Sequence, residues 1–194
     1  GLNRFDGYQF MTFQHDPEDA ETLGGNFVAA LFEDSQNRLW VGTKAGLARL
    51  DRGKGKFVRV PLLSADRTTP VNEIRSIYED AAQNIWCGTL NQGLLCLPKG
   101  GKNNPDSTRH FFHNPDDPHS IQPKDITKIW EDKQGFLWLE HEDAMSRMDK
   151  QRERFQFFPL PQELDLDVPL QDLLPKLALE QIEPIELDKI LCIG

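Results

Sequence analysis

The stretch EDSQNRLWVGTKAGLARLD, residues 33–51, decides how this sequence is interpreted, because the chain repeats it twice. The second copy is EDAAQNIWCGTLNQGLLCL, residues 79–97, and the third is EDKQGFLWLEHEDAMSRMD, residues 131–149. Self-similarity at a period of this size is typical of repeat architectures, in which each copy forms one supersecondary unit. The repetition therefore predicts a repeat protein.

The tryptophans of the three copies, Trp40, Trp86 and Trp138, lie 46 and 52 residues apart, and the extra length falls in polar, proline-containing segments. Four short β-like pieces recur in each copy. In the first copy they are NFVAALFED, RLWVG, GLARLD and KFVRV. Their lengths and spacing predict a four-stranded antiparallel unit whose insertions lie in loops.

Turn residues join these pieces. Asp34 to Asn37 links the first piece to the second, and Asp132 to Gly135 does so in the third copy. Aspartate can bond the backbone two residues on, and asparagine or glycine accepts a left-handed conformation. The segment from Gly42 to Gly46, Gly-Thr-x-x-Gly, predicts a second tight hairpin between the second and third pieces.

Four-stranded sheets at this period predict a β-propeller, in which sheets pack face to face around an axis. Apolar residues on both faces of a strand, as in Leu39-Trp40-Val41, are expected where each sheet lies between two others. A β-solenoid is the main alternative, but its repeats are usually shorter and lack these hairpins. The predicted fold class is all-β: a β-propeller fragment of four-stranded antiparallel blades, with three whole blades and two complementary half-blades.

The frame of the repeat sets the predicted boundaries. GLNRFD at residues 1–6 aligns with GLARLD, a third strand, and LCIG at residues 191–194 aligns with LWVG, a second strand. We expect a half-blade, three whole blades and a half-blade at residues 1–13, 14–60, 61–113, 114–158 and 159–194. We interpret LQDLLPKLALEQI as a loop with at most one helical turn, followed by a strand, because prolines limit any helix. Since the half-blades are complementary, we expect self-association or pairing with the remainder of a propeller.

The composition excludes some classes of partner. The formal charge of −9, from 31 acidic and 22 basic residues, would repel a phosphate backbone, so nucleic acid is not an expected partner. No apolar run is long enough for a membrane span, and the N-terminus lacks a basic stretch followed by an apolar one. A membrane connection would have to come from segments outside this chain.

Two patterns carry a family resemblance. V-x-x-I-x-E-D-x-x-G-x-L-W-x-G-T-x-x-G-L-x-R-x-D, found at residues 28–51, 74–97 and 126–149, resembles the two-component regulator propeller repeat. HNPDDPHSI at residues 113–121, with HDPEDAETL at residues 15–23 as its relative, resembles the inter-blade loop of that family. The resemblance covers about residues 1–158.

The resemblance implies a ligand-sensing region. Such propellers usually form the periplasmic part of membrane-spanning sensors, often hybrid histidine kinases or diguanylate cyclases, and several respond to oligosaccharides. We therefore expect a non-catalytic sensor module that recognises a small polar ligand such as an oligosaccharide. The alternatives are a propeller lyase or hydrolase, and a scaffold that binds another protein.

Binding residues are expected on loops, which a rigid scaffold presents at one face. The links from fourth to first strand gather there with the turns between second and third strands. The candidate ligand-binding residues are His15, Asp16, His113, Asp116, Asp117, His119, Glu140, His141, Glu142 and Asp143. The histidine and carboxylate cluster of the 113–121 loop could bind a metal, but a turn with solvated carboxylates explains it, so no metal or other cofactor is expected.

The third copy departs from the pattern where the others read Gly-Thr. It has Glu140-His141, followed by Glu142-Asp143. A position that departs from an otherwise consistent repeat indicates a functional residue or local strain. Drift in a turn that tolerates it is the other explanation, and the sequence leaves both open.

Three other sets of residues have plainer explanations. The Glu-Asp pairs that begin each copy cannot act as acid–base dyads, because strand neighbours point to opposite faces, so we interpret them as turn formers. The three repeat tryptophans are expected in the core rather than as sugar-stacking platforms. Cys87, Cys96 and Cys192 are expected to be buried thiols, with a Cys87–Cys96 cross-strand bridge left open.

Overall fold

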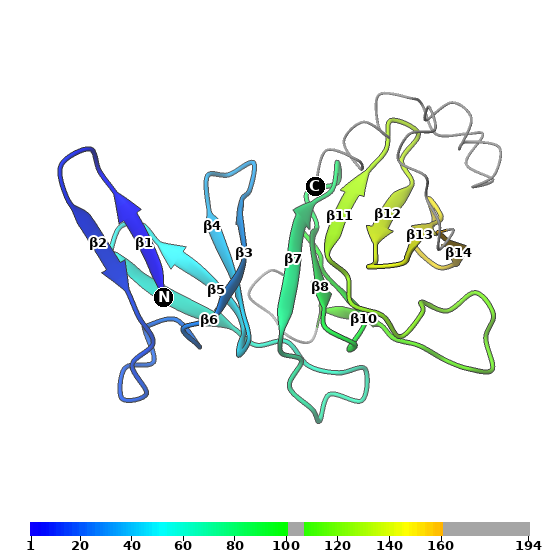
Figure 1. Cartoon of the computed structure of the whole chain (residues 1–194), viewed down its shortest axis with the longest axis horizontal. Helices are drawn as coiled ribbons and strands as arrows, with labels where there is room; N and C mark the ends of the chain where they lie inside the picture. The colour runs from blue at the N-terminus through cyan, green and yellow to red at the C-terminus, as the bar shows by residue number, and fades with distance from the viewer. Residues whose placement is uncertain (101–106, 161–194) are drawn as a thin grey trace.

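The computed structural model describes residues 1–100 and 107–160. The described chain forms antiparallel sheets, one of two strands and three of four (Figure 1). The two-stranded sheet, here the N-terminal hairpin, comprises β1 (Leu2–Phe5) and β2 (Phe10–Phe13). Blade 1 comprises β3 (Val28–Glu33), β4 (Leu39–Thr43), β5 (Gly46–Asp51) and β6 (Lys56–Val60).

Blades 2 and 3 repeat the strand order of blade 1, with each strand beside its neighbour in sequence. Blade 2 comprises β7 (Ile74–Glu79), β8 (Ile85–Thr89), β9 (Leu94–Leu97) and β10 (Arg109–Phe111). Blade 3 comprises β11 (Lys128–Glu131), β12 (Leu137–Glu140), β13 (Ala144–Met148) and β14 (Phe155–Pro159). The C-terminal half-blade, the helical turn near residue 170 and Cys192 were predicted for residues that lie outside the described ones.

Separate apolar cores join the sheets face to face. The core between blades 1 and 2 contains Trp40, Ile77 and Ile85, and the core between blades 2 and 3 contains Trp86 and Ile129. The repeat tryptophans are 0%, 0% and 1% exposed, which confirms the prediction that they are core residues rather than surface platforms. Burial of large aromatic side chains at every interface holds the array together.

The predicted Asp turns are present in all three blades. In blade 1, Oδ1 of Asp34 accepts hydrogen bonds from the amides of Gln36 and Arg38, both at 3.0 Å. Asn37, at the last position of the turn, has a φ of +57°, the left-handed conformation expected there. The same aspartate also accepts a bond from the indole of Trp40, so one side chain fixes both the turn and the core residue.

The glycine of the Gly-Thr pair is required by close packing between blades. A Cβ at Gly88 would lie 2.4 Å from Oγ of Ser76 and 2.6 Å from Cγ2 of Ile126, the first buried residue before β11. A Cβ at Gly42 would lie 2.8 Å from Cγ2 of Ile74. These glycines let the innermost strand of the next blade approach the second strand of the preceding one.

The cysteines of blade 2 are buried free thiols. Cys87 faces Leu95, and Cys96 faces Trp86, in the register of β8 and β9, so the two thiols occupy different rows of the ladder. Burial raises the pKa of the Cys87 thiol, and it raises the pKa of Cys96 to about 12. The cross-strand bridge left open by the sequence is not formed.

The described residues form no helix long and apolar enough to cross a membrane.

Candidate functional site

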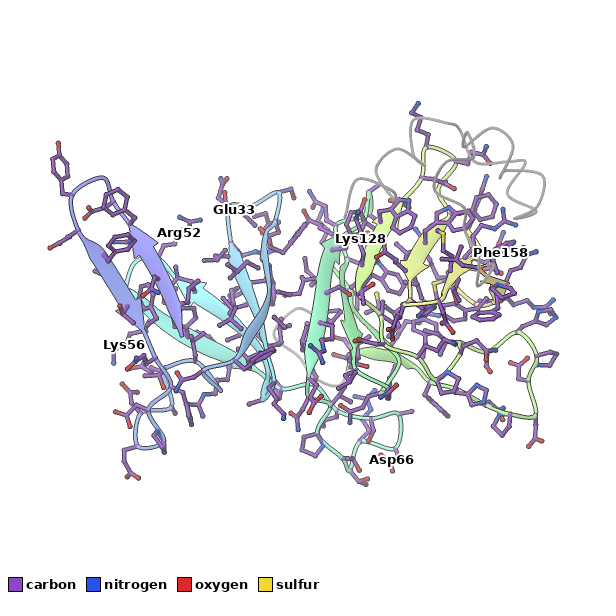
Figure 2. All side chains as sticks on the ribbon, in the orientation of Figure 1. Glu33, Arg52, Lys56, Asp66, Lys128 and Phe158 are labelled. Carbon is purple, nitrogen blue, oxygen red and sulfur yellow. The ribbon has the colours of Figure 1, made fainter. Side chains whose placement is uncertain are left out.

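The loop face is the end of the sheets where the links between blades emerge. Figure 1 shows the links that follow β2, β6 and β10 at the lower end of the sheets, and Figure 2 places Asp66 of the middle link there. The turns between second and third strands lie at the same end, since strands alternate in direction. The sequence predicted this gathering of loops.

Two of the links are built in the same way. In the first, the amide of Asp16 donates to Oγ1 of Thr22, whose hydroxyl bonds back to the Asp16 carbonyl. In the third, Asn114 and Ser120 make the same pair of contacts. The residue that closes each loop, Leu23 or Ile121, is buried, and these side chains anchor the links to the cores.

The histidines of these links hold the loops closed. Nδ1 of His15 donates to the carbonyl of Leu23 at 2.8 Å, and Nδ1 of His113 donates to the carbonyl of Ile121 at 3.0 Å. Asp117 accepts a hydrogen bond from the amide of His119, at the exposed tip. Contacts within the 113–121 loop therefore explain the presence of several residues that the sequence suggested as ligand-binding candidates there.

A pocket of about 440 Å³ opens on the loop face between blades 2 and 3. It is bounded by the 64–66 link, the 91–93 turn, the end of β10 and the start of the next link. Its lining residues are Ser64, Ala65, Asp66, Val71, Asn91, Gln92, Gly93, His110, Phe112, His113, Gln122 and Pro123. Of the residues proposed from sequence, His113 alone lines this pocket; the others lie elsewhere.

His110 is the most informative residue of the pocket. Its Nε2 donates to the carbonyl of Gln92 at 2.6 Å, so the neutral ring presents Nδ1 as an acceptor. Nδ1 is buried and has no hydrogen-bond partner within residues 1–100 and 107–160. Buried polar atoms are normally paired, so an unpaired acceptor on a residue that lines a pocket is suited to a ligand hydroxyl or amide that reaches it.

Phe112 supplies an apolar surface beside His110. The two ring centroids are 5.6 Å apart at an interplanar angle of 50°, and Phe112 is 52% exposed. The 91–93 turn behind them is held in place, since Oγ1 of Thr89 donates to the carbonyl of Gly93 at 2.7 Å. The pocket thus combines one aromatic face with polar groups on a fixed turn.

Asp66 adds a negative charge at the rim of the pocket. Hydrogen bonds from the Ser64 hydroxyl and the Thr68 amide lower the pKa of its carboxyl to about 2. The group is therefore ionised throughout the neutral range. A pocket with one carboxylate, one imidazole acceptor and one exposed phenyl ring is suited to a polar, uncharged or cationic molecule rather than to an anion.

The His141 side chain is part of the blade 3 core. Its Nδ1 donates to the carbonyl of Asp125 at 2.9 Å, and its Nε2 lies 2.8 Å from Oγ of Ser146, which donates to it in the neutral ring. Burial lowers the pKa of the His141 imidazole, and the positive charge of Lys124 lowers that pKa further. The Asp125 carbonyl and the Asp143 carboxylate act in the opposite direction but do not outweigh burial. His141 occupies the position of the threonine whose hydroxyl closes this turn in the other blades, but here the backbone amide of His141 closes the turn by donating to the carbonyl of Ala144.

The neighbours of His141 belong to the same turn. Both carboxylate oxygens of Asp143 accept hydrogen bonds from Lys124, at 2.6 and 2.7 Å. Oε1 of Glu140 accepts a 3.2 Å bond from Thr127, and Glu142 is exposed. The turn therefore has its own stabilising contacts, although Glu140 fills a position at which blades 1 and 2 need glycine.

The structure brings together no metal-binding group. Within the described residues, no three His, Cys, Asp or Glu side chains lie close enough to hold a metal ion. Asp116, Asp117 and His119 lie at the exposed tip of the 113–121 loop.

Comparisons with known proteins place these features in a family. Residues 22–45 and 69–91 match the family model of the two-component regulator propeller. These two segments of the chain are similar to two-component regulator propeller repeats. A 92-residue segment is 26% identical to histidine kinase P4 of Formosa agariphila, and this segment spans 45% of the chain but 7% of that kinase.

Solved structures share the fold of the described chain. The extracellular domain of a hybrid two-component system from B. thetaiotaomicron superposes with a TM-score of 0.60 at 21% identity, over 81% of this chain and 21% of that one. Virginiamycin B lyase from Staphylococcus aureus superposes with a TM-score of 0.57 at 16% identity, over 82% of this chain and 48% of that one. At these identities the likeness shows the fold alone, and it confirms the predicted β-propeller class.

The repeat pattern of the sequence did not indicate His110, Phe112 or Asp66 as pocket residues. His110 and Phe112 lie in and just after β10, the strand that varies most between copies, and Asp66 lies in the one link without the histidine motif. Repeat alignment highlights positions that recur, so it passes over residues that occur in one blade. An aromatic residue beside a histidine at the end of an outer strand was the available signal.

Proposed function

We propose that this chain is part of the ligand-sensing propeller of a membrane-anchored two-component or cyclic-dinucleotide signalling protein, located outside the cytoplasm and without catalytic activity. The repeat family, the segment shared with a histidine kinase and the fold shared with an extracellular sensor domain support the proposal. The chain spans only 7% of that kinase, so the kinase or cyclase output belongs to the proposal as well.

The ligand we propose is a small polar molecule such as an oligosaccharide, bound in the loop-face pocket. The observation that carries this proposal is the unpartnered Nδ1 of His110 next to the half-exposed ring of Phe112. A sugar offers hydroxyl donors to an imidazole acceptor and an apolar C–H face to a phenyl ring. The Asp66 carboxylate provides a further acceptor for hydroxyl groups.

Thermal-shift measurements with a panel of soluble oligosaccharides test the proposal. A sugar that binds only the native state at a hundred times its Kd should raise the free energy of unfolding by about 2.7 kcal/mol. Phe112→Ala should abolish the shift. Tyr8→Ala, which removes a 96% exposed aromatic ring at the far tip of the N-terminal hairpin, should preserve it.

The same samples distinguish the alternatives. A propeller lyase or hydrolase would consume a sugar or lactone, and turnover abolished by His113→Ala or His141→Ala would overturn the non-catalytic proposal. A protein-binding scaffold would show no shift with any sugar of the panel. Either result would leave the fold assignment intact and remove the proposed ligand.

A further inference from the structure

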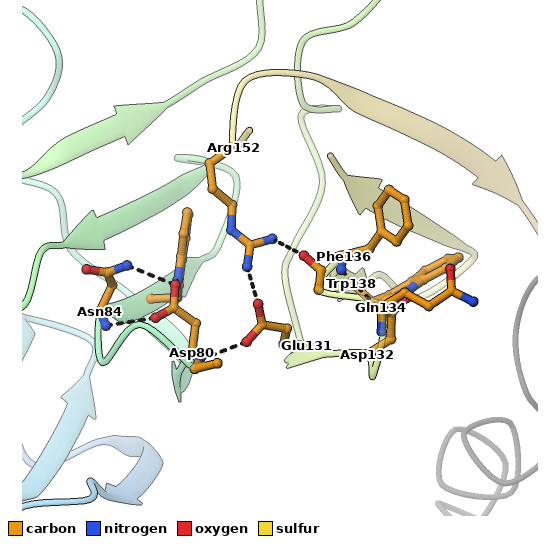
Figure 3. A network of polar contacts seen from close by, with 11 residues as sticks. Asp80, Asn84, Glu131, Asp132, Gln134, Phe136, Trp138 and Arg152 are labelled. Carbon is orange, nitrogen blue, oxygen red and sulfur yellow. Dashed lines mark hydrogen bonds and ion pairs between the residues drawn. The ribbon is translucent and has the colours of Figure 1, made fainter. Parts of the chain in front are cut away.

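A glutamate links blade 2 to blade 1, and another links blade 3 to blade 2, at the end opposite the loop face. Oε2 of Glu131 accepts a 2.7 Å hydrogen bond from the amide of Ala81 (Figure 3). Oε2 of Glu79 accepts a 2.6 Å bond from the amide of Ser35. Ala81 and Ser35 each follow the turn aspartate of the preceding blade. In blades 2 and 3 the last residue of the innermost strand therefore holds the Asp turn of the preceding blade.

An apolar contact accompanies this hydrogen bond. Two residues before the glutamate, Ile77 is 9% exposed and Ile129 is 5% exposed, and both lie in inter-blade cores. The equivalent residue of blade 1 is Leu31, since it faces Val41 as Ile77 faces Cys87. Leu31 is 52% exposed. On the innermost strand of blade 1, the face that carries Leu31 is therefore not covered by a neighbouring sheet as the equivalent faces of blades 2 and 3 are.

Glu33 occupies the glutamate position of blade 1 and is half exposed (Figure 2). Arg52 binds its carboxylate and donates to the carbonyl of Asn37. Arg152 makes the matching contacts with Glu131 and Gly135, and there Glu131 also accepts the amide from the preceding blade (Figure 3). Glu33 is thus oriented like Glu131, but within the described chain no preceding turn reaches it.

The N-terminal hairpin covers only the outer part of the same face. Phe13 packs edge-on against Phe57 with ring centroids 5.3 Å apart, and the apolar cluster between hairpin and blade involves Ala48 and Leu50. In blades 1–3 the third strand lies between the second and fourth strands, whereas β1 pairs only with β2 in the described chain. Among residues 1–100 and 107–160, no strand pairs with the other edge of β1, which lies beside the uncovered part of the face, and such an edge is a template for strand addition.

We propose that Leu31, Glu33 and the free edge of β1 form a docking site for one kind of partner, an antiparallel two-stranded hairpin of the repeat's own type. Its second strand pairs with β1, its apolar face covers Leu31, and the residue after its turn aspartate donates its amide to Glu33. The hairpin supplies the first and second strands of the blade whose third and fourth strands are β1 and β2. This site is separate from the loop-face pocket and does not depend on the proposed ligand.

The test extends the chain by a copy of its own residues 72–92, placed directly before Gly1. In blade 2 this segment leads into Gly93, the position that Gly1 holds in the hairpin. We expect Tm to rise by about 3 °C or more, as a gain of roughly 1 kcal/mol or more would give in a chain of this size. Hydrogen exchange of the β1 amides should slow by at least about tenfold, because an edge strand becomes a central one.

A matched control replaces the copied Ala81 with proline in the extension alone. Proline suits the first turn position but has no amide hydrogen, so the strands remain while the bond to Glu33 is lost. This control should keep the protection of β1 and lose part of the Tm gain. Glu33→Ala should lower Tm more in the extended chain than in the original chain, where it removes only the contact with Arg52.

Two results would overturn the proposal. The first is an extended chain with the same Tm and the same β1 exchange rates as the original chain. The second is an equal effect of Glu33→Ala in both chains, together with no loss from the proline control. An original chain that is already dimeric by light scattering, with protected β1 amides, would show that a second copy occupies the face and would also contradict the proposed occupant.

Discussion

The indole Nε1 of Trp40 donates a 2.8 Å hydrogen bond to Oδ2 of Asp34, the residue that also holds the first turn of blade 1. Trp86 and Asp80 repeat this bond at 2.8 Å, as do Trp138 and Asp132. Burial raises the pKa of the Asp34 carboxyl, but the hydrogen bonds from Trp40 and Arg38 outweigh burial and hold that pKa below its ordinary value. The turn and the core of each blade are therefore parts of one unit.

Asp80→Ala should lower the free energy of unfolding by about 3 kcal/mol, because it leaves the buried Trp86 indole N–H and turn amides without their acceptor. Urea unfolding measures the loss. Trp86→Phe and the double variant complete a cycle, in which the coupling between the two residues should exceed about 0.5 kcal/mol. Additive losses would show that turn and tryptophan are stabilised independently.

His141 should make the stability of the protein depend on pH. Because burial lowers its folded-state pKa, the unfolded chain binds the proton at a higher pH than the folded chain does. The stabilisation is therefore complete above about pH 6.5, the ordinary histidine pKa, and declines as pH falls from there toward the folded-state pKa. The slope from this group can reach about 1.4 kcal/mol per pH unit.

Unfolding of the wild type and of His141→Thr between pH 7.5 and 5 measures this effect. Threonine is the residue of the other blades at this position and does not titrate, so the variant should show a shallower slope. Equal slopes in both proteins would mean that His141 accepts a proton in the folded state as readily as in the unfolded chain.

Gly88→Ala should destabilise the interface between blades 2 and 3 by about 1–3 kcal/mol, since the added Cβ would overlap Ser76 and Ile126. Gly100→Ala is the matched control, because nothing lies within 4 Å of a Cβ there. The control should change stability by less than about 0.5 kcal/mol. A Gly88→Ala variant as stable as the control would show that the blades can separate slightly at no cost.

Cys87 and Cys96 should resist alkylation in the folded protein. Burial keeps both thiols protonated at pH 8 by raising their pKa values, and the thiolate is the reactive form. On a Cys192→Ser background, iodoacetamide should modify neither cysteine in native buffer and both in urea, as mass spectrometry would show. Fast labelling of the native protein, or a Cys87–Cys96 disulfide, would contradict the buried environment.

The sequence predicts the blades well because their determinants are local. The aspartate turn, the tryptophan and the Gly-Thr hairpin of each copy lie within about twenty residues of one another, so their spacing is visible by alignment. The contact of Glu79 with Ser35 joins residues 44 apart in different copies, and the sequence analysis explained the glutamates only as turn formers. A contact between copies leaves no local pattern.

The candidate site was predicted less well for a related reason. His15 and His113 drew attention because their motif recurs, and the structure shows that this recurrence reflects the closure of a loop by a histidine. His110 and Phe112 occur in one blade, and their proximity to the 64–66 link depends on how the link between blades 1 and 2 lies over the loop face of blade 2. The repeat pattern predicts the blades, whereas the pocket is formed by residues that do not follow the repeat pattern.

The most direct test of the sensing account is NMR titration of the ¹⁵N-labelled histidine rings with an oligosaccharide that shifts Tm. The account predicts that the His110 Nδ1 resonance moves on binding, as a free acceptor gains a hydrogen bond, while the buried His141 ring does not. The Phe112→Ala variant should lose this change. Saturable sugar binding that leaves His110 unaffected, or that persists in Phe112→Ala, would contradict the assignment of the loop-face pocket as the ligand site.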